Sequence, residues 1–290
     1  MAPLPAPSPL PPGRGDPPRP HIGVFDSGIG GLSVLRALRA KLPAARLSYI
    51  ADSRHTPWGE RPAAWVAERC QQLSAALLAD GADLVVVACN TATTQAIASL
   101  RERWPGLPFV GIEPGIKPAV AASQAGRVAV LATPGTLGSA RLQHLVHTHA
   151  RDVMLLRLPC PGLADALETA WQDADALHRQ LDSIAATLRQ AEVDTVVLGC
   201  THYPLVAPAL QQRLGAGVQL VDVAEAVARR VASLLPAAAG DASPANRPLP
   251  RLMATGATGA LAQAARHWLG LDLAVQALDL PEPASHGPGR

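Results

Sequence analysis

A near-repetition of one segment constrains the fold of this chain more than any other feature of its sequence. Residues 83–89 read DLVVVAC and residues 194–200 read DTVVLGC, so two apolar runs of strand length each end in a cysteine. A second pair of similar segments, residues 22–28 and 128–135, precedes the first pair at nearly the same spacing. The repetition predicts two related lobes, each of which contributes one cysteine at the end of a strand.

Short apolar runs alternate with helical segments along most of the chain. Continuous β-branched runs separated by helices are typical of parallel strands covered on both faces, and ligands bind at the carboxyl ends of such strands. We therefore predict an α/β fold of two pseudo-symmetric lobes, each with a mainly parallel sheet flanked by helices, and an active site in the cleft between the lobes. The expected strands are 21–25, 46–50, 84–88, 108–112, 127–132, 153–158, 194–199, 218–222 and 251–254, and the expected helices are 30–42, 62–80, one from about 91, and 258–269.

Proline-rich segments mark the expected boundaries of these lobes. Residues 1–20 contain nine of the 28 prolines and are predicted to form a disordered tail. Residues 280–290 resemble them and are predicted to form a second flexible tail, while residues 236–250 are expected to form a loop. The lobes themselves are predicted to comprise residues 21–113 plus 223–279 for the first and residues 114–222 for the second.

Composition excludes several classes of protein. The net charge is +2 with no basic cluster, so no nucleic-acid partner is expected. No apolar run reaches membrane-spanning length and no secretory signal is recognisable, so we expect a cytoplasmic protein without a membrane partner. The four cysteines are widely spaced, which argues against a structural zinc site and against a disulfide scaffold.

Cys89 lies in the segment ACNTAT, where a buried strand meets the next helix, which Thr91 or Thr93 can begin. Backbone N–H groups at a helix N-terminus lower the pKa of a thiol and bind anions, so Cys89 is a candidate catalytic thiol. Asn90 and Thr91 supply polar groups beside it. The alternative is a buried cysteine that acts as a small apolar residue.

Cys200 lies in the corresponding segment GCTHYP, in which Pro204 can occupy a first helical turn. His202 is two residues away and can carry a proton or act as the electrostatic partner of the thiol. The alternative is a capped turn with a surface histidine. That alternative explains one segment, but it does not explain why both halves place a cysteine beside polar groups.

Three other polar segments follow expected strands. Asp26 and Ser27 lie in FDSGIGG. The Asp26 side chain can assist a thiol, the Ser27 hydroxyl can bind a substrate carboxylate, and the glycines let the backbone approach a ligand. The alternative is a turn that caps a helix. The loop 52–62 is a candidate for function or a plain surface turn. The hydroxyls of Thr133 and Thr136 can bind a charged group of a ligand, and the alternative is that they cap a helix.

Several residues that carry reactive groups are assigned no function. Cys70 lies mid-helix and is interpreted as structural, and the role of Cys160 stays open. His144, His147 and His149 share a helix without a second ligand cluster, so no metal site is expected there.

The segments FDSGIGG, PWGERP, ACNTAT and GCTHYP, in this order, resemble the bacterial glutamate racemase family, as do IEPGIKPA at 112–119 and the TG at 255–256. The resemblance covers about residues 21–270. It implies two α/β lobes, no cofactor, no metal, and interconversion of L- and D-glutamate to supply D-glutamate for peptidoglycan.

The resemblance also implies individual roles. Cys89, assisted by Asp26, would deprotonate D-glutamate, and Cys200, assisted by His202, would deprotonate L-glutamate. The residues implied to bind substrate are Asp26, Ser27, Trp58, Gly59, Asn90, Thr91, Thr133, Thr136, Glu168, Thr201 and His202. Racemisation suits two acid–base groups because a proton must leave one face of Cα and arrive on the other.

The sequence departs from the family pattern at two places. Trp58 stands where the family usually has tyrosine, and Asp222 is followed by Val223 and Ala224 where Ser-Gly is frequent. The EPGIKPA stretch is similar to members activated by a cell-wall precursor, so UDP-N-acetylmuramoyl-L-alanine is a candidate activator of a monomer or homodimer. Rival functions are an aspartate or hydantoin racemase, a non-catalytic anion-binding protein, and a thiol-redox protein with a Cys89–Cys200 disulfide.

Overall fold

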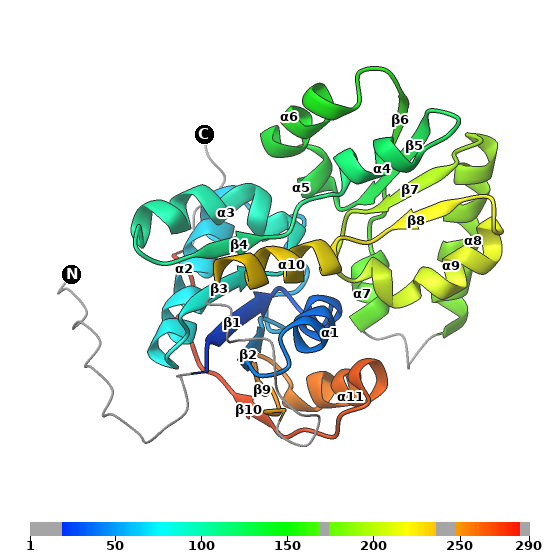
Figure 1. Ribbon diagram of the computed structural model, residues 1–290. Helices are drawn as coiled ribbons and strands as arrows, with labels where there is room; N and C mark the ends of the chain where they lie inside the picture. The colour runs from blue at the N-terminus through cyan, green and yellow to red at the C-terminus, as the bar shows by residue number, and fades with distance from the viewer. Residues whose placement is uncertain (1–18, 169–173, 236–246, 285–290) are drawn as a thin grey trace.

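The chain folds into two parallel β-sheets, each with helices on both faces (Figure 1). This computed structural model describes residues 19–168, 174–235 and 247–284. Every strand pair in these ranges is parallel. The predicted α/β fold with two lobes is therefore confirmed.

The first sheet has the strand order β10-β9-β2-β1-β3-β4. Helices α1, α10 and α11 share one apolar cluster on one face, and α2 and α3 share another on the opposite face. The strands are β1 (His21–Asp26), β2 (Arg46–Ala51), β3 (Leu84–Val87), β4 (Phe109–Gly111), β9 (Arg251–Ala254) and β10 (Val275–Ala277). The helices are α1 (Leu32–Lys41), α2 (Ala63–Ala79), α3 (Asn90–Arg103), α10 (Ala224–Leu234) and α11 (Thr258–Leu269).

The second sheet has the strand order β6-β5-β7-β8 and lies at the upper right of Figure 1. Its helices also cover two faces, with α7, α8 and α9 on one and α4 and α6 on the other. The strands are β5 (Arg127–Ala132), β6 (Met154–Pro159), β7 (Thr195–Leu198) and β8 (Gln219–Val221). The helices are α4 (Ile116–Ala122), α5 (Pro134–Leu137), α6 (Ala140–His149), α7 (Leu163–Glu168), α8 (Ala174–Gln190), the 3-10 turn η1 (Tyr203–Val206) and α9 (Ala207–Leu214).

The two sheets repeat one another in strand order. The order β2-β1-β3-β4 of the first sheet corresponds to the order β6-β5-β7-β8 of the second. In both, the strand that comes first in the chain lies between the second and the third, and the fourth lies beside the third. Cys89 lies two residues beyond the end of β3, and Cys200 lies two residues beyond the end of the equivalent strand β7. The near-repetition in the sequence is thus a repetition of structure, and it places one thiol at the same point of each lobe.

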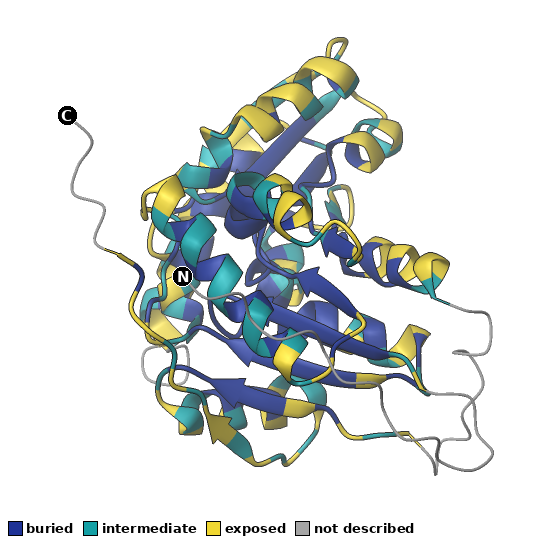
Figure 2. Cartoon of the chain, turned by 90° about the vertical axis from the view of Figure 1, so that its left-hand side faces the viewer, coloured by how far each residue is buried: buried dark blue, intermediate teal, exposed yellow. Residues whose placement is uncertain are grey.

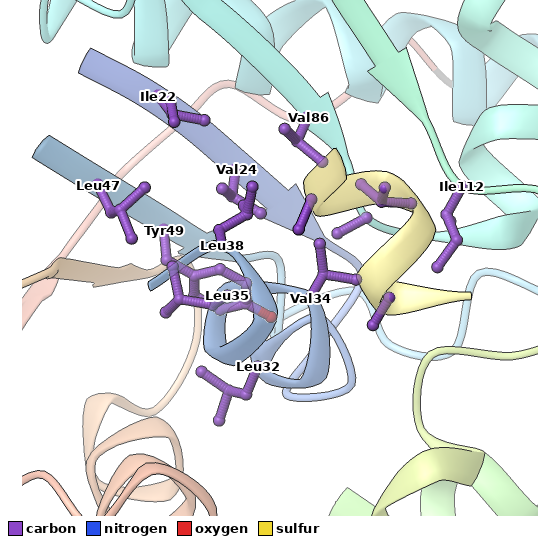
Figure 3. Packing of buried hydrophobic residues seen from close by; sticks show 14 of the residues in the cluster. Ile22, Val24, Leu32, Val34, Leu35, Leu38, Leu47, Tyr49, Val86 and Ile112 are labelled. Carbon is purple, nitrogen blue, oxygen red and sulfur yellow. The ribbon is translucent and has the colours of Figure 1, made fainter. Parts of the chain in front are cut away.

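Apolar burial stabilises the first sheet. All six residues of β1 are buried, and Figure 2 shows the strands as the buried centre of the molecule. Helix α1 packs Leu35 and Leu38 towards Val24 and Tyr49 (Figure 3), because its apolar residues recur at helical spacing on one face. Each such side chain contributes about 1.5–3 kcal/mol when fully buried.

The structure differs from the sequence-based expectations near the C-terminus. Strand β10 was not predicted, because it is a three-residue edge strand with one half-buried side chain and two exposed ones. The first residues of the predicted flexible tail, up to 284, make hydrogen bonds to α2. Residues 1–18 and 285–290 of the two predicted tails, and 236–246 of the predicted loop, lie outside the described residues.

No helix in the described ranges is both long enough and apolar enough to cross a membrane.

Candidate active site

Cys89 and Cys200 line one pocket between the two lobes. The pocket brings together most of the residues singled out in the sequence, namely Ser27, Trp58, Gly59, Cys89, Asn90, Thr91, Thr133, Thr136, Cys200, Thr201 and His202. Thr56, Pro57, Ala164 and Gly199 also line it and were not predicted. Thr56 belongs to the polar loop 52–62, but nothing in its local sequence distinguishes it from the loop's other polar residues.

Asp26 and Glu168 do not line the pocket but lie directly behind it. The Asp26 carboxylate accepts hydrogen bonds from Thr201 Oγ1 at 2.7 Å and from Ser27 Oγ at 3.0 Å. Glu168 Oε1 accepts from the Ile29 backbone N–H at 2.7 Å. Both carboxylates therefore join the lobes, because the bond between Asp26 and Thr201 and the bond between Glu168 and Ile29 each run from one lobe to the other.

The glycines of the FDSGIGG segment serve this contact between the lobes. A Cβ atom at Gly30 would lie 2.7 Å from both the backbone nitrogen of His202 and Thr201 Oγ1, and one at Gly28 would collide with the Glu168 carboxylate. Approach of a ligand was the expected reason for these glycines. The structure instead shows that they admit residues of the second lobe.

The pocket is narrow, with a cavity volume of about 20 Å³. That is room for about one water molecule. A substrate of amino-acid size therefore requires the pocket to widen.

Cys89 is buried at the N-cap of α3, as the sequence indicated. Its thiol donates to Ser27 Oγ at 3.8 Å, and Ser27 donates in turn to Asp26. The expected lowering of its pKa is not found. Burial, followed by the charge of Asp26, raises the pKa of Cys89 to about 12, and the hydrogen bonds from the Ala92 backbone and Ser27 only reduce that rise.

Cys200 has an imidazole as its neighbour. Its Sγ lies 3.8 Å from His202 Nδ1, and His202 Nε2 lies 2.7 Å from Glu168 Oε1. His202 is only 2% exposed, so the alternative of a surface histidine is wrong. Burial disfavours its cationic form, but hydrogen bonds to Cys200 and Glu168 outweigh burial and raise the pKa of His202 well above its ordinary value. A cationic His202 stabilises negative charge on the Cys200 sulfur.

The pKa of Asp26 is also raised, because burial of the carboxylate outweighs the nearby His202 charge and the three hydrogen bonds it accepts. Tyr49 holds the same loop from beneath, donating from its hydroxyl to the Gly28 carbonyl at 2.6 Å. Tyr49 was not predicted, because it lies inside an apolar strand.

Polar groups without a strong partner gather at the other side of the pocket. The hydroxyls of Thr91, Thr133 and Thr136 lie 3.1–3.4 Å from one another across the two lobes. Thr133 also caps α5. Both polar side-chain atoms of Asn90 are buried without a hydrogen-bond partner among the described residues. Buried polar groups are normally satisfied, so this amide is available to a polar ligand.

The loop 52–62 contributes Trp58 and Gly59 from the first lobe. The indole N–H of Trp58 donates to Asp52 Oδ2 at 3.2 Å, away from the pocket. A Cβ atom at Gly59 would lie 2.9 Å from Thr133, so the loop also touches the second lobe.

The remaining reactive side chains lie elsewhere. Cys70 is fully buried in α2, where burial raises its pKa, and Cys160 is buried after β6 with its pKa raised by burial to about 12. All four cysteines are free thiols. Among the described residues, no three His, Cys, Asp or Glu side chains form a group that could hold a metal ion, and this includes the histidines of α6.

Comparison with known proteins places this geometry in a family. The family model described as Asp/Glu/Hydantoin racemase matches residues 31–231. The chain belongs to the Asp/Glu/hydantoin racemase family. It is therefore an enzyme of the isomerase class, and its two sheets are the two lobes of that family's fold.

Several similar members of this family are glutamate racemases. The chain is 47% identical to glutamate racemase from Pseudomonas aeruginosa over 218 residues, which is 75% of this chain and 82% of the relative. The crystal structure of glutamate racemase isoform RacE1 from Bacillus anthracis superposes with a TM-score of 0.80 at 30% identity, covering 90% of this chain and 98% of that one. An Escherichia coli glutamate racemase in complex with L-glutamate and the activator UDP-MurNAc-ala gives 0.77 at 34% identity and covers the same shares.

Proposed function

We propose that this enzyme is a glutamate racemase that works with two thiols and without a cofactor. The observation that carries the proposal is the position of Cys89 and Cys200, which line one pocket from equivalent strand ends of two lobes. The glutamate racemases to which the chain is 47% and 34% identical support glutamate as the substrate.

In this mechanism each thiol acts on one face of Cα. Cys200 removes the proton from L-glutamate while Cys89 donates one to the opposite face, and the roles reverse for D-glutamate. With a pKa of about 12 Cys89 is protonated, and the cationic His202 favours negative charge on Cys200. Cys89 can therefore act as the proton donor in the conversion of L-glutamate to D-glutamate.

Each thiol has its own chain of hydrogen bonds for exchanging the proton. Cys89 is connected through Ser27 to Asp26, and Cys200 through His202 to Glu168. We assign Asp26 and Glu168 to these chains rather than to direct substrate contact.

The substrate is bound by the polar groups that still have hydrogen-bonding capacity. The hydroxyls of Thr91, Thr133 and Thr136 and the amide of Asn90 can hold the carboxylates and the ammonium group, with Thr201 beside them. Preorganised donors of this kind stabilise the carbanion that forms when Cα loses its proton. Trp58 and Gly59 form the wall opposite.

Deuterium exchange tests the proposal. In D2O without cofactor, the wild type should racemise glutamate and replace the Cα proton of both enantiomers. Cys89→Ser should lose racemisation and keep exchange only with L-glutamate, whereas Cys200→Ser should keep exchange only with D-glutamate. Cys70→Ser is the matched control, because Cys70 lies outside the pocket and should leave turnover intact. Full racemisation by either active-site variant would eliminate the two-thiol mechanism.

A substrate panel separates this function from its rivals. Exchange of aspartate or hydantoin protons without exchange of glutamate protons would assign the chain to a sister activity of the family. An anion-binding role predicts that both serine variants behave like the wild type. A redox role predicts a Cys89–Cys200 disulfide under oxidising conditions, which peptide mapping would detect.

The proposal extends to the cell wall. D-Glutamate is the product that peptidoglycan synthesis consumes, and the Escherichia coli relative was crystallised with a precursor of that pathway as activator. The segment IEPGIKPA supports the same activation here. Titration with UDP-N-acetylmuramoyl-L-alanine should raise the rate of racemisation, and a flat titration would dispose of this part of the proposal.

A further inference from the structure

Behind the pocket wall lies a buried charged network that the proposed chemistry does not use. Arg69 donates to the Asp52 carboxylate from Nη2 at 2.7 Å and from Nε at 3.0 and 3.1 Å. Both side chains are fully buried. Thr255 Oγ1 and His55 Nδ1 bond the same carboxylate. A buried ion pair of this kind adds little net stability but is costly to disturb, so its neighbours are held in one arrangement.

The network ends at the substrate pocket on one side. Asp52 Oδ2 accepts the indole N–H of Trp58, which lines the pocket together with Gly59. Trp65 packs edge-on against Trp58 with ring centroids 5.8 Å apart. The Trp58 indole is therefore held on the side away from the pocket by Asp52 and Trp65.

On its other side the network ends at residues 281–284, here called the C-terminal strap. The Pro281 carbonyl accepts from Arg69 Nη1 at 3.0 Å. Glu282 Oε2 lies 2.9 Å from His55 Nε2. Pro283 is buried, and the Ala284 backbone N–H donates to Glu68 at 3.1 Å. The strap thus supplies hydrogen-bond partners to Arg69 and His55, two of the four described residues whose side chains bond the Asp52 carboxylate.

We propose that the C-terminal strap is a positioning element of the substrate site, acting through Arg69 and Asp52 on Trp58. Arg69 and Glu282 are its positioning residues, and they touch no substrate. The kinetic effect rests on the proposed racemase function. Displacement of Trp58 and Gly59, which line the pocket, should weaken the binding of glutamate while both thiols stay in place.

Two truncations test the strap. A chain ending at Leu280 lacks the strap, and a chain ending at Ala284 lacks only the residues beyond it and is the matched control. The shorter chain should show a KM for glutamate raised about tenfold, the change expected from one lost hydrogen bond to a charged group, with kcat changed less than about twofold. The longer chain should match the wild type.

Indole resonances provide a readout that does not depend on activity. The chain has five tryptophans, and 15N labelling with a Trp58→Phe variant identifies the Trp58 signal. In the chain ending at Leu280 the Trp58 and Trp65 signals should shift, while those of Trp104 and Trp268, which pack against Phe109 and His267, should stay. If the wild type fails to racemise glutamate, the proposed function fails, and these resonances alone decide the role of the strap.

Point variants remove one contact without shortening the chain. Glu282→Ala should raise KM and shift the Trp58 signal in the same direction as the truncation, though less, because the Glu282 side chain is 65% exposed. Glu282→Gln keeps an acceptor for His55 and should restore both. Asp279→Ala, which breaks only an exposed pair with Arg54, should change neither. Two results for the chain ending at Leu280 would overturn the proposal. One is an unchanged Trp58 resonance together with an unchanged KM. The other is a general effect, in which the melting temperature and kcat fall and all four tryptophan signals change.

Discussion

The sulfur of Cys200 lies 3.8 Å from Nδ1 of His202, whereas Cys89 has no imidazole among its partners and contacts the Ser27 hydroxyl instead. The two halves of the site are thus equivalent in backbone and different in side chains. Each thiol is linked to a carboxylate by one intermediate group, which is an imidazole in one half and a hydroxyl in the other.

His202 makes the stability of the protein depend on pH. Its pKa is raised well above 6.5 in the folded chain, so the folded chain keeps a proton that the unfolded chain loses above about pH 6.5. The free energy of unfolding should therefore be highest below pH 6.5 and fall as the pH rises towards 8, by up to about 1.4 kcal/mol per unit. Urea unfolding across this range measures it. His202→Asn should flatten the dependence, and an unchanged slope would contradict the assignment.

Ser27→Ala should break the connection between Cys89 and Asp26. We expect kcat to fall about tenfold, the effect of losing a hydrogen bond to a charged group. Ser27→Thr retains the hydroxyl and is the control. Equal rates for the alanine and threonine variants would show that Cys89 exchanges its proton by another route.

Gly30→Ala should prevent the lobes from closing. The added methyl would lie 2.7 Å from the His202 backbone nitrogen, which is unable to move without shifting the strand-end turn. We expect kcat/KM for glutamate to fall about 100-fold, within the usual contribution of one positioned acid–base group.

Two other glycines serve as comparisons for Gly30. Gly28→Ala meets the end of the Glu168 side chain rather than backbone, and it should cost activity through the bond between Glu168 and His202, to a smaller extent than Gly30→Ala. Gly106→Ala meets nothing within 4 Å and should be silent. A Gly30→Ala variant as active as Gly106→Ala would show that the closed contact is not needed for turnover.

Cys89 should react slowly with iodoacetamide. Only the thiolate reacts, and with a pKa of about 12 its population at pH 8 is about a thousandfold lower than for an ordinary cysteine. Asp26→Asn removes the second largest cause of this shift and should accelerate alkylation of Cys89. Mass spectrometry of the Cys89 peptide follows the reaction, and rapid labelling of the wild type would be incompatible with a protonated thiol.

The sequence allowed the positions of the thiols to be predicted because each follows an apolar strand of recognisable length. Strand β5, β9 and helix α11 were predicted with the bounds that the structure has. The contact of His202 with Glu168 and that of Arg69 with Asp52 were not derivable, because each joins segments whose proximity depends on how helices pack. The high pKa of Cys89 was missed for a related reason. A helix N-terminus is visible in sequence, but the degree of burial that outweighs it is not.

The matching strand orders of the two sheets have a stereochemical consequence. In these strand orders β1 and β3 correspond to β5 and β7, and Cys89 corresponds to Cys200 across the same pocket. In the proposed mechanism the two thiols therefore face opposite sides of the substrate Cα, and each enantiomer presents its proton to a different thiol. The planar carbanion is the one species that presents the same geometry to both halves, so a flat analogue of it should bind more tightly than either amino acid.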